Sequence, residues 1–73
     1  MKPNKAQIAL FIYDTLLQDG ILRKADVLSL TGISDLTFLR YMQDIKAYLR
    51  NFRDNYDICY HRKDDAYHLN KRA

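Results

Sequence analysis

A chain of 73 residues has room for one domain with a small core, which argues against an enclosed substrate pocket and therefore against an enzyme. Hydrophobic residues make up 48% and charged residues 29%, a balance that excludes a disordered chain. The net charge of +3 is small, so any binding to nucleic acid must depend on where the cations lie rather than on total charge.

Cysteine content and hydropathy indicate the compartment in which the chain is expected. Cys59 is the only cysteine, so no disulfide can form within the chain and a reduced cytoplasmic setting is expected. No stretch approaches the roughly 18 apolar residues of a membrane span, and the first residues lack the pattern of a signal peptide. We therefore expect no membrane association.

The first predicted helix covers residues 4–18. Asn4 can cap it, and Gln7 follows three residues later, as in a capping box. Gly20 is suited to the left-handed conformation that ends many helices. The core-facing positions recur at spacings of three and four and are Ile8, Phe11, Ile12, Thr15 and Leu16.

A short strand at Ile21 and Leu22 and a second helix over residues 24–30 follow. Asp26 in the first turn of this helix suits the helix dipole. Its apolar positions are Ala25, Val27, Leu28 and Leu30.

The stretch between the second and third helices predicts a tight turn. Gly32 permits a positive φ angle, Ile33 can fill the gap between two helices, and Ser34 can cap the helix that begins after it. A short helix, a glycine turn and a capped helix together form a helix-turn-helix. The third helix is predicted over residues 35–52, with a core stripe formed by Phe38, Met42, Ile45, Leu49 and Phe52.

The last part of the chain changes to a period of two and predicts a β-hairpin over residues 56–70. If His61 pairs with Ala66, the four apolar positions share one face, which can close over the helices. These positions are Ile58, Tyr60, Tyr67 and Leu69. The polar loop carries no glycine, so a connection of four or more residues is expected.

Three helices followed by a hairpin predict a mostly α fold with a small β-hairpin, the three-helix winged helix-turn-helix, in a single domain over residues 1–73.

Two segments also resemble a known family. The third helix matches a recurrent motif at Ser34, Thr37, Phe38, Arg40 and Ile45. The hairpin matches another at Tyr56, Ile58, Tyr60, Tyr67 and Leu69. Together they resemble the N-terminal DNA-binding domains of bacterial DeoR-type regulators, and most closely those that precede a WYL ligand-sensing domain. The chain departs from that pattern at Leu36, where the family often has Arg, and at Tyr41, where it often has Asp.

The resemblance implies a DNA-binding domain of a bacterial transcriptional regulator, with the recognition helix in the major groove and the wing on the backbone. Double-stranded DNA is the expected partner, and a homodimer is the usual state of such domains. The expected contact residues on the third helix are Ser34, Asp35, Leu36, Thr37, Leu39, Arg40 and Gln43.

Each of these residues also has a simpler interpretation. Arg40 can bind a phosphate or guanine, or be a solvated surface residue. Ser34 and Thr37 can donate to phosphates, or Ser34 can simply cap the helix. Gln43 can contact adenine or lie on an ordinary helix surface, and Asp35 can accept from cytosine or stabilise the helix end.

Leu36 and Leu39 have three interpretations. They can contact thymine methyl groups, pack against the second helix or the wing, or form a protein-protein surface. The last alternative, together with the Asp residues near this face, keeps open a winged-helix module that binds protein instead of DNA.

Outside the third helix, Lys24, Arg62 and Lys63 are further candidates for contacts with the DNA backbone. Asp64 and Asp65 beside the latter two weaken their positive field. Cys59, His61 and His68 fall short of the four ligands of a structural zinc site, so no metal, cofactor or small-molecule site is expected.

Overall fold

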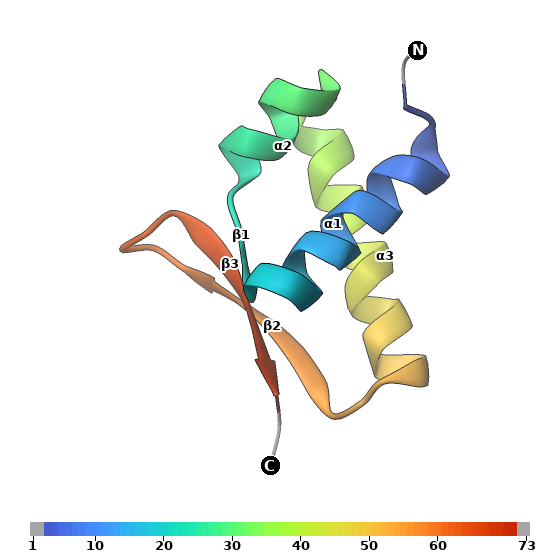
Figure 1. The fold of residues 1–73 in the computed structure, drawn as a ribbon, viewed down its shortest axis with the longest axis vertical. Coiled ribbons are helices and arrows are strands. Elements are labelled where there is room, and N and C mark those ends of the chain that lie inside the picture. The colour runs from blue at the N-terminus through green and yellow to red at the C-terminus, as the bar shows by residue number, and fades with distance from the viewer. Residues whose placement is uncertain (1–2, 72–73) are drawn as a thin grey trace.

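The computed structural model of the chain describes residues 3–71 and is shown in Figure 1. The elements in chain order are α1 (Lys5–Asp19), β1 (Ile21–Leu22), α2 (Lys24–Thr31), α3 (Asp35–Phe52), β2 (Tyr56–His61) and β3 (Ala66–Lys71). The third helix and the short strand have the predicted bounds, and the bounds of the other elements differ by at most one residue. The predicted fold class is confirmed: the chain is a mostly helical, three-helix winged helix-turn-helix.

The strands form one antiparallel sheet in the order β1-β3-β2, which lies against one side of the helices (Figure 1). The predicted hairpin register is confirmed, since His61 pairs with Ala66 and Ile58 with Leu69. The predicted short strand β1 pairs with the other edge of β3. Each strand edge of β3 is therefore paired, and the hairpin is held to the rest of the fold by backbone hydrogen bonds.

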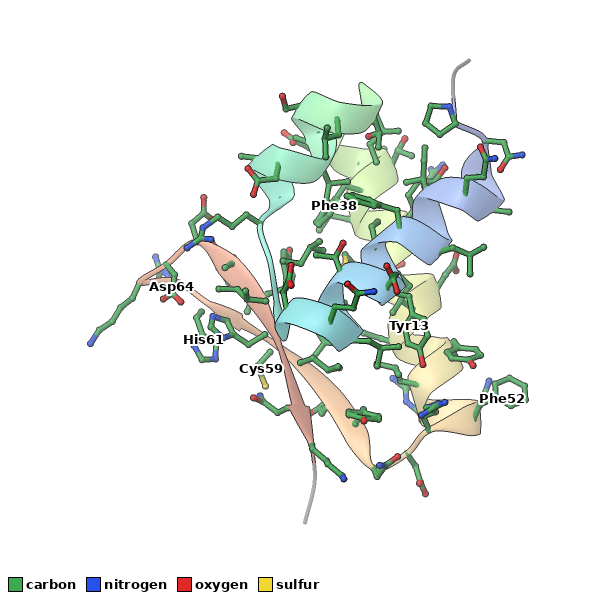
Figure 2. All side chains as sticks on the ribbon, in the orientation of Figure 1. Tyr13, Phe38, Phe52, Cys59, His61 and Asp64 are labelled. Carbon is green, nitrogen blue, oxygen red and sulfur yellow. The ribbon has the colours of Figure 1, made fainter. Side chains whose placement is uncertain are left out.

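The core lies between the three helices and the inner face of the sheet. Its largest fully buried side chains are Phe38, Ile12, Leu16, Leu49 and Val27. Figure 2 shows Phe38 pointing from α3 into the body of the molecule. There its ring packs against Tyr67 of β3, with ring centroids 5.6 Å apart. Burial of a side chain of this size contributes about 1.5–3 kcal/mol, so this contact fixes which side of α3 faces the sheet.

The predicted core stripe of α3 is wrong at its end. Phe52 is 73% exposed and projects from the last turn of α3 (Figure 2). It lies against the ring of Tyr48, at a centroid distance of 5.2 Å. The helical period continues through Phe52, but the other core elements do not extend that far. Conversely, Tyr41 lies outside the predicted stripe and is only 7% exposed.

The predicted apolar face of the hairpin is confirmed by the pairing of Tyr60 with Tyr67, but the helices do not cover it at Tyr60. Tyr60 is 48% exposed, because it stands close to the hairpin turn and beyond the helices. Its ring packs against Tyr67, and its hydroxyl donates a hydrogen bond to the Asp65 carboxylate. Phe11, predicted to face the core from α1, lies on the surface as well, and so does Leu30, one of the apolar positions of α2.

Within residues 3–71, none of the helices combines the length and the apolar character that crossing a membrane would require.

Candidate nucleic-acid interface

The turn that leads into α3 has the predicted local structure. Gly32 has a φ of 74°, and its N–H donates to the Leu28 carbonyl at 2.8 Å, which ends α2. Ile33 is half-buried and packs against the core, as expected of a residue that fills the gap between two helices. The glycine and the apolar residue together set the angle at which α3 leaves α2.

Ser34 caps α3, as predicted. Its side-chain oxygen accepts a hydrogen bond from the Thr37 N–H at 3.1 Å. Its hydroxyl donates to the Thr37 hydroxyl oxygen at 2.9 Å, so the Ser34 proton is already used within the protein. Of these two hydroxyl groups, the half-buried Thr37 hydroxyl is therefore the one whose proton is available for donation to a phosphate.

Opposite the core stripe, α3 presents a continuous exposed surface, which we call the α3 outer face. It consists of Leu36, Leu39, Arg40 and Gln43. These positions follow the spacing that places residues on one side of a helix. Leu36 is 61% exposed and Leu39 is 46% exposed, which argues against the interpretation that they are buried against α2 or the hairpin. The structure therefore brings four of the predicted contact residues together on one accessible surface.

Asp35 and Lys24 interact with each other. The Lys24 ammonium lies 3.6 Å from the Asp35 carboxylate and links the start of α2 to the start of α3. The Asp35 side chain is 70% exposed, so the pair contributes no more than about 1 kcal/mol. The ion pair nevertheless offsets the negative charge at the start of the α3 outer face, and it holds Lys24 at that end of α3.

The predicted wing residues Arg62 and Lys63 are exposed in the four-residue turn between β2 and β3. Within residues 3–71 neither makes an ion pair with the neighbouring carboxylates. Asp64 lies 2.8 Å from His68, and Asp65 accepts from Tyr60. The carboxylates that weaken the positive field of the turn are therefore engaged within the hairpin, and the two cations remain free for an outside partner.

Two further features shape the turn. Asp65 has a φ of 51°, a left-handed conformation that Asp adopts more easily than most residues. The pKa of Tyr60 is raised, chiefly because its hydroxyl donates to the Asp65 carboxylate. The neutral tyrosine thus helps to fix the residue that closes the turn.

Sequence reasoning missed one association in the hairpin. His61 and His68 stack with ring centroids 3.8 Å apart, and Asp64 joins them through its contact with His68. The predicted register, in which His61 pairs with Ala66, already placed both histidines on one face of the hairpin. The backbone path of the turn, which brings Asp64 beside them, had no signal in the sequence.

Comparisons with protein-family models, curated proteins and solved structures return no match for this chain.

Proposed function

We propose that this chain is the DNA-binding domain of a bacterial transcriptional regulator, with α3 in the major groove and the hairpin on the DNA backbone. The observation that carries the proposal is the α3 outer face. A capped helix, fixed to the sheet by the buried Phe38, presents Arg40 and Gln43 to solvent in a winged helix-turn-helix. In such folds the second helix of the motif enters the major groove with its N-terminal residues toward the bases.

In this proposal each residue has a chemical role. Arg40 donates to guanine or to a phosphate, and Gln43 contacts adenine. Leu36 and Leu39 contact thymine methyl groups, which are the apolar feature of the major groove. The Thr37 hydroxyl donates to a phosphate, while Ser34 and Asp35 mainly hold the start of the helix.

The hairpin turn supplies the second contact. Arg62 and Lys63 are exposed cations and make no ion pair within residues 3–71. Cations that neutralise phosphates release counterions, which favours binding without regard to sequence. We assign to them a contact with the DNA backbone beside the groove occupied by α3. Lys24 has a smaller role, because Asp35 already holds its ammonium group.

The resemblance to DeoR-type domains also favours a cytoplasmic homodimer that binds repeated half-sites. An exposed apolar surface outside the α3 outer face is suited to contact with a second copy. It contains Leu10, Tyr48 and Phe52, which are 66%, 42% and 73% exposed. Sedimentation velocity over a range of protein concentrations tests this part of the proposal.

A protein-binding module is the second candidate, and the exposure of Leu36 and Leu39 favours it. Two leucines of this exposure on one helix face are typical of an interface with another protein. The alternative predicts no binding to any duplex at moderate salt and a protein partner that is lost when Leu36 is replaced by Asp.

A selection from a pool of random duplex DNA, run at about 50 mM and about 200 mM salt, separates the two candidates. The DNA-binding proposal predicts an enriched sequence motif at both salts and much weaker total binding at the higher one. Retention of no duplex at the lower salt would contradict it and leave the protein-binding module. If DNA is retained at low salt but shares no sequence motif, the chain contacts only the DNA backbone and does not read the bases.

A further inference from the structure

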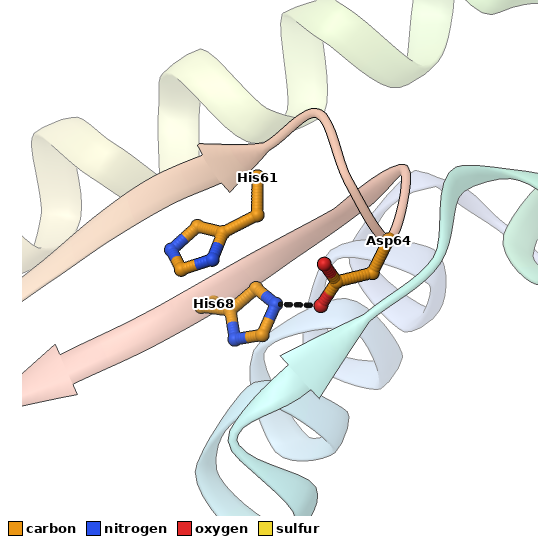
Figure 3. A group of neighbouring side chains, drawn as sticks. All are labelled: His61, Asp64 and His68. Atoms are coloured by element: carbon orange, nitrogen blue, oxygen red, sulfur yellow. Dashed lines mark hydrogen bonds and ion pairs between the residues drawn. The ribbon is translucent and has the colours of Figure 1, made fainter.

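The hairpin end brings three potential metal ligands together (Figure 3). His61 is the last residue of β2, Asp64 lies in the turn, and His68 is the third residue of β3. One ligand atom from each side chain lies within 4.8 Å of the other two. This group lies on the outer face of the hairpin, away from the core.

The spacing of these atoms nearly matches that around one bound ion. Zinc binds imidazole nitrogen and carboxylate oxygen at about 2.0–2.2 Å in a tetrahedron, so two ligand atoms on one ion lie roughly 3.3–3.6 Å apart. The His68 nitrogen lies 2.8 Å from the Asp64 carboxylate oxygen, and all three ligand atoms lie within 4.8 Å of one another, so these separations span the required range. Binding requires the imidazole rings to rotate out of their nearly parallel stack, and the exposure of His61 and Asp64 leaves room for this rotation.

An ion would replace one described contact, the one between His68 and Asp64. Within residues 3–71, His61 makes no hydrogen bond, and its described contact is the stack on His68 at an angle of 17°. His68 faces the Asp64 carboxylate at 2.8 Å. Two imidazoles and one carboxylate form a donor set favoured by zinc and neighbouring divalent ions.

Cys59 does not belong to this group. It lies opposite His68 in the strand register, yet its sulfur is not among the atoms that gather within 4.8 Å. Cys59 is also exposed, so it offers a matched control on the same face of the hairpin.

We propose that His61, Asp64 and His68 bind one divalent transition-metal ion, such as Zn²⁺, with water at the remaining positions. The expectation from sequence that the chain has no metal site counted the thiol and the imidazoles, and it left out Asp64. The turn geometry supplies the third ligand. The site does not depend on the proposed DNA binding, so either proposal can fail without the other.

Titration of the metal-free protein with Zn²⁺, followed by NMR of the imidazole rings, tests the site. The chain contains only two histidines, so every ring signal belongs to the proposed site. We expect both rings to shift and to saturate at one equivalent of Zn²⁺. Calorimetry of His61→Ala and Asp64→Ala should show at least about tenfold weaker binding, while Cys59→Ser stays within about twofold of the original chain.

Far-UV circular dichroism is the control for folding of the variants. We expect them to fold because His61 and Asp64 are exposed. Absence of saturable binding, or a shift of only one histidine ring, would overturn the proposal. Unchanged affinity in His61→Ala or Asp64→Ala would overturn the three-ligand site, as would loss of binding in Cys59→Ser.

Discussion

Phe38 and Arg40 lie two residues apart on α3 and point to opposite sides of the helix. No part of the Phe38 side chain is exposed, whereas Arg40 is exposed to solvent. Successive residues of a helix are separated by about 100°, so two steps turn a side chain by about 200°. The core contact of Phe38 therefore sets the direction of Arg40, and the proposed interface depends on the packing behind it.

Replacing Phe38 by Ala is expected to lower the free energy of unfolding by about 3–5 kcal/mol, because it leaves a cavity between α3 and the sheet. That loss is a large share of the stability of a small domain. Phe52→Ala is the matched control and should cost less than about 1 kcal/mol, since the ring is already 73% exposed. Urea denaturation followed by circular dichroism measures both, and equal losses would contradict the described core.

Gly32→Ala is expected to lower the free energy of unfolding by about 1–2 kcal/mol because of the backbone conformation at this position. A Cβ atom at this position would meet nothing within 4 Å, so steric contact with neighbours adds no cost. The φ of 74°, however, disfavours residues with a side chain. Gly32→Asn should cost less, because Asn adopts the left-handed region more readily. Thermal unfolding compares the two, and an equal or larger loss for Asn would argue against this explanation.

Much of the fold could be predicted because the period of the apolar side chains determines how the strands of the hairpin pair. A slip of one residue in the hairpin would move Ile58 and Leu69 to the wrong face, so only one pairing suits the pattern. The errors at Phe52 and Tyr41 have a common cause. Periodicity gives the direction of a side chain but contains no information about where the neighbouring elements end.

The candidate interface was predictable to a similar extent. The exposed direction of Arg40 follows from the core stripe on the opposite side of α3. The ion pair of Lys24 with Asp35 depends on the angle between α2 and α3, which the sequence does not encode in any local pattern. The approach of Asp64 to the two histidines likewise depends on the backbone of the turn, including the positive φ of Asp65.

Tyr13→Phe is expected to leave the free energy of unfolding unchanged or to raise it by up to about 1 kcal/mol. The Tyr13 hydroxyl oxygen is buried and makes no hydrogen bond of ordinary geometry with residues 3–71. Its removal therefore abolishes a desolvation cost and gives up only the weak interaction with the Tyr48 hydroxyl that also contributes to the raised pKa of Tyr13. Denaturant unfolding at neutral pH measures the change, and a loss above about 1 kcal/mol would mean that the hydroxyl has a stabilising partner.

The same tyrosine predicts a pH dependence. Burial raises the pKa of Tyr13 above its ordinary value of 10.0, and the charge of Arg53 opposes this only in part. Below the ordinary value both states keep the proton. As the pH rises above it, the unfolded state loses the proton first, so the folded state becomes relatively less stable. The original chain should lose more stability than Tyr13→Phe between about pH 9 and pH 11; parallel stability curves would contradict the shift.

Asp35→Asn is expected to strengthen binding to duplex DNA by about two- to fivefold at low salt, since it removes a negative charge beside the α3 outer face. The loss of its ion pair with Lys24 and of its interaction with the helix dipole should cost less than about 1 kcal/mol of stability. Fluorescence anisotropy of a labelled duplex measures the affinity.

Asp54→Asn, beyond the other end of α3, makes the same change in net charge and is the control. A similar gain in both variants would indicate that total charge, and not the start of α3, determines binding.

The most direct test of the account is the salt dependence of duplex binding by Arg40→Ala, measured by fluorescence anisotropy beside Arg50→Ala. Both are exposed arginines of α3, but Arg40 belongs to the α3 outer face near the start of the helix, whereas Arg50 lies in the last turn. Arg40→Ala should bind about tenfold or more weakly and, if Arg40 neutralises a phosphate, should reduce the slope of log affinity against log salt by about 1. Arg50→Ala should change little. Equal affinity and slope for Arg40→Ala and the original chain would contradict a DNA contact through this face of α3.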